Sequence, residues 1–158
     1  MRLAALLAVF VSNAYASWAT NNPQKNAVQD VSFCELANNP SAFSGKRIRV
    51  RGIYRYEFER QRLEAPTCCP ASKTKIWMEI TSDLDRKSQR LFHRFPKEGL
   101  VLATFVGTFE TGNNYGTFGE RSKLTVDQIE KIEHTAPSSP KRKDPAWVPR
   151  NCESPNAG

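Results

Sequence analysis

The clearest pattern along the chain is an alternation of apolar and charged residues between Gly45 and Arg60. One set of alternate positions is apolar and the other is charged: Ile48, Val50, Tyr54, Tyr56 and Phe58, against Arg47, Arg49, Arg51, Arg55, Glu57 and Glu59. Because successive side chains of a strand point to opposite faces, this alternation predicts a long strand over 46–58 with one buried face and one wet face. Gly52 inside it indicates a bulge or a bend, which a small barrel needs where a strand turns a corner.

Further segments have the pattern of strands. Residues 75–81 place Ile76, Met78 and Ile80 on one face. Residues 99–110 are apolar on both faces, which is typical of a strand that is covered on both sides. We also expect a short strand at 61–64 and a last strand within 121–133. The glycine-rich residues 112–119 fit a hairpin loop and not a phosphate cradle, because no helix follows them.

Two short helices complete the predicted elements. Ser32 and Glu35 fit a capping box at the start of the first helix. Residues 83–95 have apolar positions at helical spacing, which predicts a second helix capped by Asp83 or Ser82. The resulting order is helix, long strand, two strands, helix and two strands. This order favours a small closed or half-closed β-barrel, since closure removes exposed strand edges.

The first sixteen residues have the pattern of a secretory signal peptide. Arg2 is a short positive region, 3–11 is an apolar run too short to span a bilayer, and Ala14-Tyr15-Ala16 is a small-x-small cleavage site. We therefore expect a secreted or periplasmic protein, cleaved after Ala16, with no transmembrane segment. A buried N-terminal helix is the alternative for this run.

The rest of the chain divides into three parts by composition. Residues 17–30 are polar and lack a period, so we expect a flexible leader; residues 31–134 form the predicted barrel domain, and 135–158 a tail rich in prolines and basic residues. Cleavage removes one arginine and no acid, which leaves 22 basic and 16 acidic residues and a formal charge of +6. That charge favours anionic partners without requiring them.

The chain holds four cysteines: Cys34, Cys68, Cys69 and Cys152. An even number of cysteines in an exported chain argues for disulfides. A bond between the adjacent Cys68 and Cys69 would be strained, so we expect Cys34 and Cys152 each to pair with one of these two, in either connectivity. The rival interpretation is a metal or thiolate site, but Cys-Cys lacks the Cys-x-x-Cys spacing of zinc sites. We expect no metal and no cofactor.

A series of short motifs lies between Cys34 and Glu133: Cys34-Glu35-Leu36, Asn39-Pro40, Phe43, Gly45 to Tyr54, Ile76 to Glu79, Phe105 to Phe109 and Tyr115 to Gly119. In these motifs the chain resembles an uncharacterised family of small exported bacterial proteins with an OB-fold-like β-barrel. The resemblance implies a mainly β fold, a five- to six-stranded OB-like barrel with an N-terminal short helix and one helix before the penultimate strand. It implies no known activity. The late loop of the family tends to read Gly-Tyr-Gly-His-x-Gly, and Thr117 stands here where that histidine would be.

The candidate ligand-binding residues are basic or aromatic: Arg47, Arg49, Arg51, Arg55, Trp77, Tyr115 and Phe118. On an OB-type barrel, a basic strand face with aromatic residues can hold single-stranded nucleic acid or a polyanionic glycan. The competing interpretation of the arginines is a solvated charged face. The exported compartment argues against nucleic acid.

Motifs for catalysis are missing from the sequence. Neither Gly-x-Ser-x-Gly nor His-Glu-x-x-His occurs, and the carboxylates that might act as acid and base have arginine neighbours. We therefore expect an exported, non-enzymatic binding module for an anionic ligand or an envelope component. The alternative is a protein-interaction or structural role in the envelope, or an inhibitor-like role. A thiol-redox or metal-binding protein is the third interpretation.

Overall fold

The computed structural model describes residues 27–65, 74–138 and 144–148. Along the chain it has these elements: β1 (Gln29–Asp30), α1 (Phe33–Asn38), the 3-10 helix η2 (Pro40–Phe43), β2 (Arg47–Glu57), β3 (Arg60–Glu64), β4 (Ile76–Ile80), α2 (Arg86–Phe92), β5 (Gly99–Tyr115) and β6 (Glu120–Pro137). The first helix begins with the predicted capping box, in which the Ser32 side chain accepts from the Glu35 backbone and the Glu35 carboxylate accepts from the Ser32 backbone.

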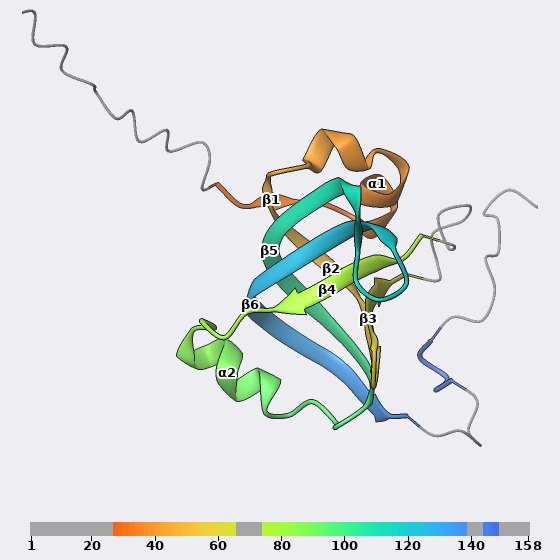
Figure 1. Ribbon diagram of the computed structural model, residues 1–158. Helices are drawn as coiled ribbons and strands as arrows, with labels where there is room; N and C mark the ends of the chain where they lie inside the picture. Colours follow the sequence, from red (N-terminus) through yellow and green to blue (C-terminus); the bar gives the residue numbers. More distant parts are fainter. Residues whose placement is uncertain (1–26, 66–73, 139–143, 149–158) are drawn as a thin grey trace, which may run out of the picture.

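Five strands form a ring of hydrogen bonds in the order β2, β3, β4, β6 and β5, and β5 pairs back with β2 (Figure 1). β4 and β6 run parallel, and the other pairs in the ring are antiparallel. β1 adds a short parallel pairing to β2. This barrel-like, mainly β arrangement, with one helix before the penultimate strand, confirms the predicted OB-like fold. Ring closure leaves few unpaired strand edges.

The core lies inside the ring, where Ile48, Val50 and Tyr54 of β2 are buried as the alternation predicts. Of the bulge or bend predicted at Gly52, the bulge is wrong, because the register between β2 and β5 runs unbroken past it. A Cβ atom at Gly52 would lie 2.8 Å from Leu63 Cδ1, so the glycine makes room for that leucine.

Phe58 departs from the alternation of β2. It lies in the two-residue turn between Glu57 and Arg60, which pair with each other, and it is 90% exposed instead of facing the core. Its φ angle is 24°, and a positive φ at the first position of such a turn favours glycine. A phenylalanine there combines backbone strain with exposure of a large apolar side chain.

Residues expected to be a leader and a tail also take part in the fold. Gln29 and Asp30 form β1, and β6 continues to Pro137, beyond the predicted limit at residue 134. On the outer side of the ring, Ile53, Leu100 and Leu102 are buried together with Val148 from the segment 144–148. The residues alternating with them, such as Val101 and Ala103, face the main core, which confirms that this part of β5 is covered on both sides.

The second helix begins later than the sequence predicts. The cap is Asp85, whose carboxylate accepts from the Ser88 backbone at 2.7 Å, and not Asp83 or Ser82. Leu84 just before it is buried, and the helix starts at Arg86. Ser88 is fully buried, and its hydroxyl accepts from the Ile129 backbone N–H at 2.8 Å and donates to the Ile129 carbonyl at 3.2 Å. This serine therefore fixes α2 to β6.

Removing the Ser88 hydroxyl should lower the free energy of unfolding by about 1–3 kcal/mol, because Ser88→Ala leaves two buried backbone groups of Ile129 without a partner. Urea unfolding measures the loss. Ser82→Ala is the matched control, since the Ser82 hydroxyl bonds only the neighbouring Asp83 at an exposed site, and it should change stability by less than about 0.5 kcal/mol. Equal losses in the two variants would contradict the anchoring role of Ser88.

Candidate functional site

The arginines of β2 meet a row of carboxylates that projects from β6. Arg49 forms two hydrogen bonds to Glu130, at 2.8 and 2.9 Å, and a third at 2.8 Å to Asp30. Arg51 forms two hydrogen bonds of 2.8 Å to Glu133. Arg47 forms the same two-point contact with Asp127. We call these three pairs the arginine–carboxylate ladder.

β-bulges in β6 bring the carboxylates opposite the arginines. The arginines recur every second residue, but Asp127, Glu130 and Glu133 recur every third residue. The register between β5 and β6 shifts at each of these three positions, so that each carboxylate is the extra residue of a bulge with no partner on β5. Ile129 and Ile132 keep their contact with the core between the bulges. The bulges thus let one strand present an acidic row outward and an apolar row inward.

These ion pairs occupy the arginines that the sequence suggests for ligand binding. The hydrogen bonds from Arg51 hold the pKa of the Glu133 carboxyl below its usual value, and the same contacts raise the pKa of Arg51. Val106, in register with Arg49, faces outward yet is fully buried. We infer that the arginine stems cover it while their charged ends meet the carboxylates. Ladder arginines therefore hold β2 to β6, and the structure favours the charged-face interpretation for them.

Arg55 is paired as well, with Glu64 of β3 at 3.2 Å and with Asp144 at 2.9 Å. It lines a hollow of about 530 Å³ beside the end of β6, together with Leu100 and Trp147. Because its guanidinium already contacts two carboxylates, this hollow offers an anion little free positive charge.

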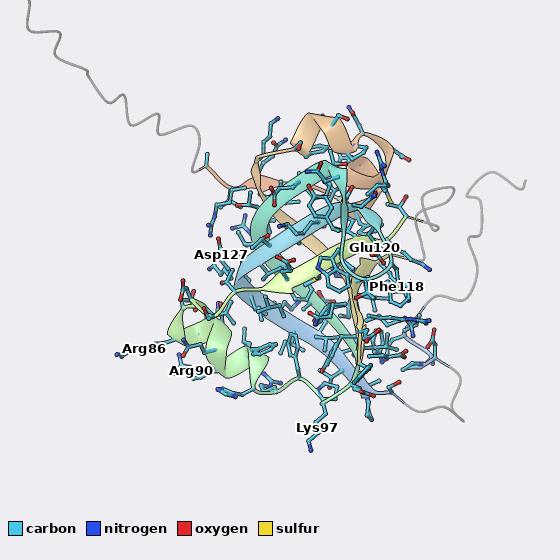
Figure 2. The ribbon with its side chains drawn as sticks, in the orientation of Figure 1. Arg86, Arg90, Lys97, Phe118, Glu120 and Asp127 are labelled. Atoms are coloured by element: carbon cyan, nitrogen blue, oxygen red, sulfur yellow. The ribbon has the colours of Figure 1, made fainter. Side chains whose placement is uncertain are left out.

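A second basic and aromatic group lies on the outer face of β3 and β4, beside the hairpin that joins β5 to β6. Five residues line a hollow of about 410 Å³ there: Arg60, Arg62, Lys75, Phe118 and Glu120. We call this hollow the β3–β4 hollow. Figure 2 shows Phe118 and Glu120 close together at this side of the molecule, away from Arg86 and Arg90 on α2. On OB-type barrels the second and third strands and the adjacent loops commonly carry the ligand.

The cations of the β3–β4 hollow are largely free of carboxylate partners. Within the part of the chain that the structure describes, Arg60 and Lys75 form no ion pair, and Arg60 lies over the Phe118 ring with 5.0 Å to its centroid. The Arg62 side chain is only 11% exposed, and its one carboxylate neighbour, Glu64, is 3.8 Å away. Arg62 Nε is buried without a hydrogen-bond partner among the described residues. Because this atom is closed to solvent, a ligand in the hollow meets the rest of the Arg62 side chain and not Nε.

Glu120 gives the same hollow an acceptor. Its Oε2 atom is buried and, among the described residues, also lacks a hydrogen-bond partner. Three cationic side chains beside one carboxylate suit a ligand that carries both an anionic group and hydroxyl donors, because the cations donate to the anionic group and the carboxylate accepts from the hydroxyls. The exposed Phe118 ring, 52% accessible, adds an apolar surface on which a ring can lie.

Trp77 and Tyr115 lie beside the hollow and support the hairpin. Trp77 Nε1 donates to Glu79 at 3.2 Å, and a Cβ atom at Gly116 would lie 2.2 Å from the Trp77 ring, so the hairpin packs directly on it. Lys123 lies over the Tyr115 ring, with 5.3 Å to the ring centroid. The contacts of Lys123 with Glu110, and to a lesser degree with Glu79, raise the pKa of this lysine.

The residues proposed from the sequence therefore lie in different places. Phe118 lines the β3–β4 hollow, Trp77 and Tyr115 hold its hairpin, and the four arginines of β2 lie elsewhere in ion pairs. Sequence reasoning missed Arg60, Arg62 and Lys75. A weaker signal was present, because the charged residues Arg60, Arg62 and Glu64 occupy alternate positions and Leu63 lies between two of them.

Cys34 lies in α1, whereas Cys68, Cys69 and Cys152 fall outside the described residues, so the disulfide pairing stays a prediction. Within 27–65, 74–138 and 144–148, no group of three or more His, Cys, Asp or Glu side chains is placed to hold a metal ion. No helix in these segments has the length and apolar character needed to cross a membrane. No model of a known protein family matches the chain, and no curated protein matches it.

Proposed function

We propose that this protein is an exported, non-enzymatic binding module whose β3–β4 hollow takes an acidic carbohydrate. One observation carries the proposal: Arg60, Arg62 and Lys75 line one hollow with Phe118, and within the described residues Arg60 and Lys75 form no ion pair. Export is part of the proposal and rests on the signal-peptide pattern of residues 1–16.

The chemistry of an acidic sugar matches the lining of the hollow. Its carboxylate or sulfate oxygens accept hydrogen bonds from the cations, and a charge-assisted hydrogen bond is stronger than a neutral one. Its hydroxyls can donate to the Glu120 carboxylate, which would repel a simple anion such as sulfate. Its ring has an apolar face that can pack on Phe118.

The proposal predicts that a heparin-derived tetrasaccharide binds the full chain in 50 mM salt and that Arg60→Ser/Lys75→Ser weakens binding at least tenfold. Each lost charged hydrogen bond is worth about 1.5–3 kcal/mol. Isothermal titration calorimetry measures the affinity. Arg86→Ser/Arg90→Ser is the matched control, because it removes the same charge from α2, and it should change the affinity less than twofold. Equal weakening by both variants, or no binding by the unmodified chain, would overturn the proposal.

A protein-interaction or structural role in the envelope is the second candidate, and the exposure of Phe118 at the hairpin favours it. Aromatic side chains that protrude are common anchors of protein interfaces. This candidate predicts that Phe118→Ser abolishes capture of an envelope protein while the tetrasaccharide leaves that capture unchanged.

A further inference from the structure

Helix α2 and the residues after it carry a concentrated set of cations: Arg86, Lys87, Arg90, Arg94 and Lys97. All five are exposed, and none forms an ion pair within the described residues. The helix buries its other side, with Ser88 in the core and Leu91 packed against it. Figure 2 shows Arg86, Arg90 and Lys97 pointing outward from the same end of the molecule.

Two exposed phenylalanines accompany these cations. Phe58, 90% exposed, and Phe92, 41% exposed, line a common hollow of about 420 Å³ with Lys97. Phe58 comes from the β2–β3 turn and Phe92 from α2, so two separate elements bring apolar rings to one end of the protein. Phe58 also holds a positive φ angle. A strained backbone and an exposed ring both disfavour this residue for stability, so a role outside the fold explains it better.

Carboxylates also lie at the turn that carries Phe58: Glu57 and Glu59 flank it in the sequence, and Glu57 and Glu98 line the same hollow. Glu98 Oε1 accepts from the Phe58 backbone N–H at 3.4 Å, and Glu57 Oε1 accepts from the Ser138 hydroxyl at 3.1 Å. Asp85 caps the helix through Ser88. These hydrogen bonds come from neutral donors and leave the carboxylates charged, so the positive charge of this end gathers on α2 and the residues after it, beside Phe92.

We propose that this end of the protein docks on the surface of an anionic lipid bilayer. Phe58 and Phe92 enter the boundary between headgroups and acyl chains, and the five cations contact lipid phosphates. Apolar side chains flanked by Lys and Arg are the composition that binds this interface. The export proposed above disfavours nucleic acid, and two protruding apolar rings beside cations suit a bilayer surface better than an acidic peptide. This proposal uses residues apart from the β3–β4 hollow and does not rest on carbohydrate binding.

Vesicle sedimentation of the full chain in 50 mM salt tests the proposal. Vesicles with 30% phosphatidylglycerol in phosphatidylcholine should bind the protein, and pure phosphatidylcholine vesicles should not. Arg86→Ser/Arg90→Ser should weaken binding about twenty-five-fold, at about fivefold for each cation. Phe58→Gly should weaken it about tenfold or more through the lost ring. Its thermal midpoint should stay at or above that of the unmodified chain, because glycine accepts a positive φ.

Two controls decide whether the effect belongs to this surface. Arg60→Ser/Lys75→Ser removes equal charge and Phe118→Ser removes another exposed ring, and both should bind vesicles within twofold of the unmodified chain. If Phe58→Gly folds poorly, Phe92→Ser replaces it, with the same expected loss. Binding to neutral vesicles, no binding to anionic vesicles, or equal losses in the controls would each overturn the proposal. So would an oligonucleotide that binds this surface while anionic vesicles do not.

Discussion

Gly107→Ala is expected to lower the free energy of unfolding by more than about 3 kcal/mol. A Cβ atom at Gly107 would lie 2.1 Å from the Thr125 carbonyl oxygen and 2.9 Å from Val126 Cα. Both contacts are with the backbone of β6, which cannot rotate away as a side chain can. Gly107 also lies at the register shift that makes Asp127 project outward from β6. The alanine would therefore separate β5 from β6 where the arginine–carboxylate ladder begins, and urea unfolding measures the loss.

Gly52→Ala is the matched control for this prediction. The Cβ atom added at Gly52 would lie 2.8 Å from Leu63 Cδ1 and 3.3 Å from the Glu64 carbonyl oxygen, so its shortest contact is with the end of a side chain and not with backbone. We expect a loss of about 1–2 kcal/mol, well below that of Gly107→Ala. A Gly107→Ala protein as stable as Gly52→Ala would show that β6 can move aside, which contradicts the tight β5–β6 pairing described above.

Gly116→Ala is expected to have the second-largest effect. It should lower the free energy of unfolding by about 2 kcal/mol or more and weaken ligand binding in the β3–β4 hollow. Its φ angle is 62°, which disfavours alanine, and the added Cβ would lie 2.2 Å from the Trp77 ring. The hairpin must then lift away from β4 and carry Phe118 and Glu120 with it. We therefore expect the tetrasaccharide affinity to fall together with the thermal midpoint.

The Gly119→Ala variant separates the effect of backbone strain from the effect of the contact with the Trp77 ring. Gly119 has a φ angle of 68°, close to that of Gly116, but an added Cβ meets nothing within 4 Å. Only the backbone strain remains, so the loss should be about 1 kcal/mol. If both alanines cost the same and leave tetrasaccharide binding unchanged, then packing of the hairpin on Trp77 does not shape the hollow.

The strand alternation predicts β2 well because its pattern is local. Ile48, Val50 and Tyr54 face the core through the two-residue period of any strand. The prediction fails at Phe58, where a tight turn to β3 overrides the period. The two-residue period fails for β6 as well. Three bulges make its outward carboxylates recur every third residue, and no residue pattern in a single sequence marks where a bulge occurs.

The candidate site was harder to predict than the fold for a physical reason. Whether an arginine is free depends on which carboxylate it meets, and the partner of Arg49 on β6 is 81 residues away. Composition alone makes the arginines of β2 and those of β3 look alike. Only the closed ring shows that the first set is paired across β5, whereas Arg60 and Lys75 remain open to solvent beside Phe118.

The most direct test of the central claim is a backbone amide NMR titration of the full chain with the heparin-derived tetrasaccharide. The claim is that the β3–β4 hollow, and not the arginine–carboxylate ladder, receives an acidic ligand. We predict that the largest chemical-shift changes fall on residues 60–62, 75–77 and 116–120, while 47–51 and 127–133 stay unchanged. Changes centred on the ladder or on α2, with the amides of the hollow unmoved, would contradict the claim.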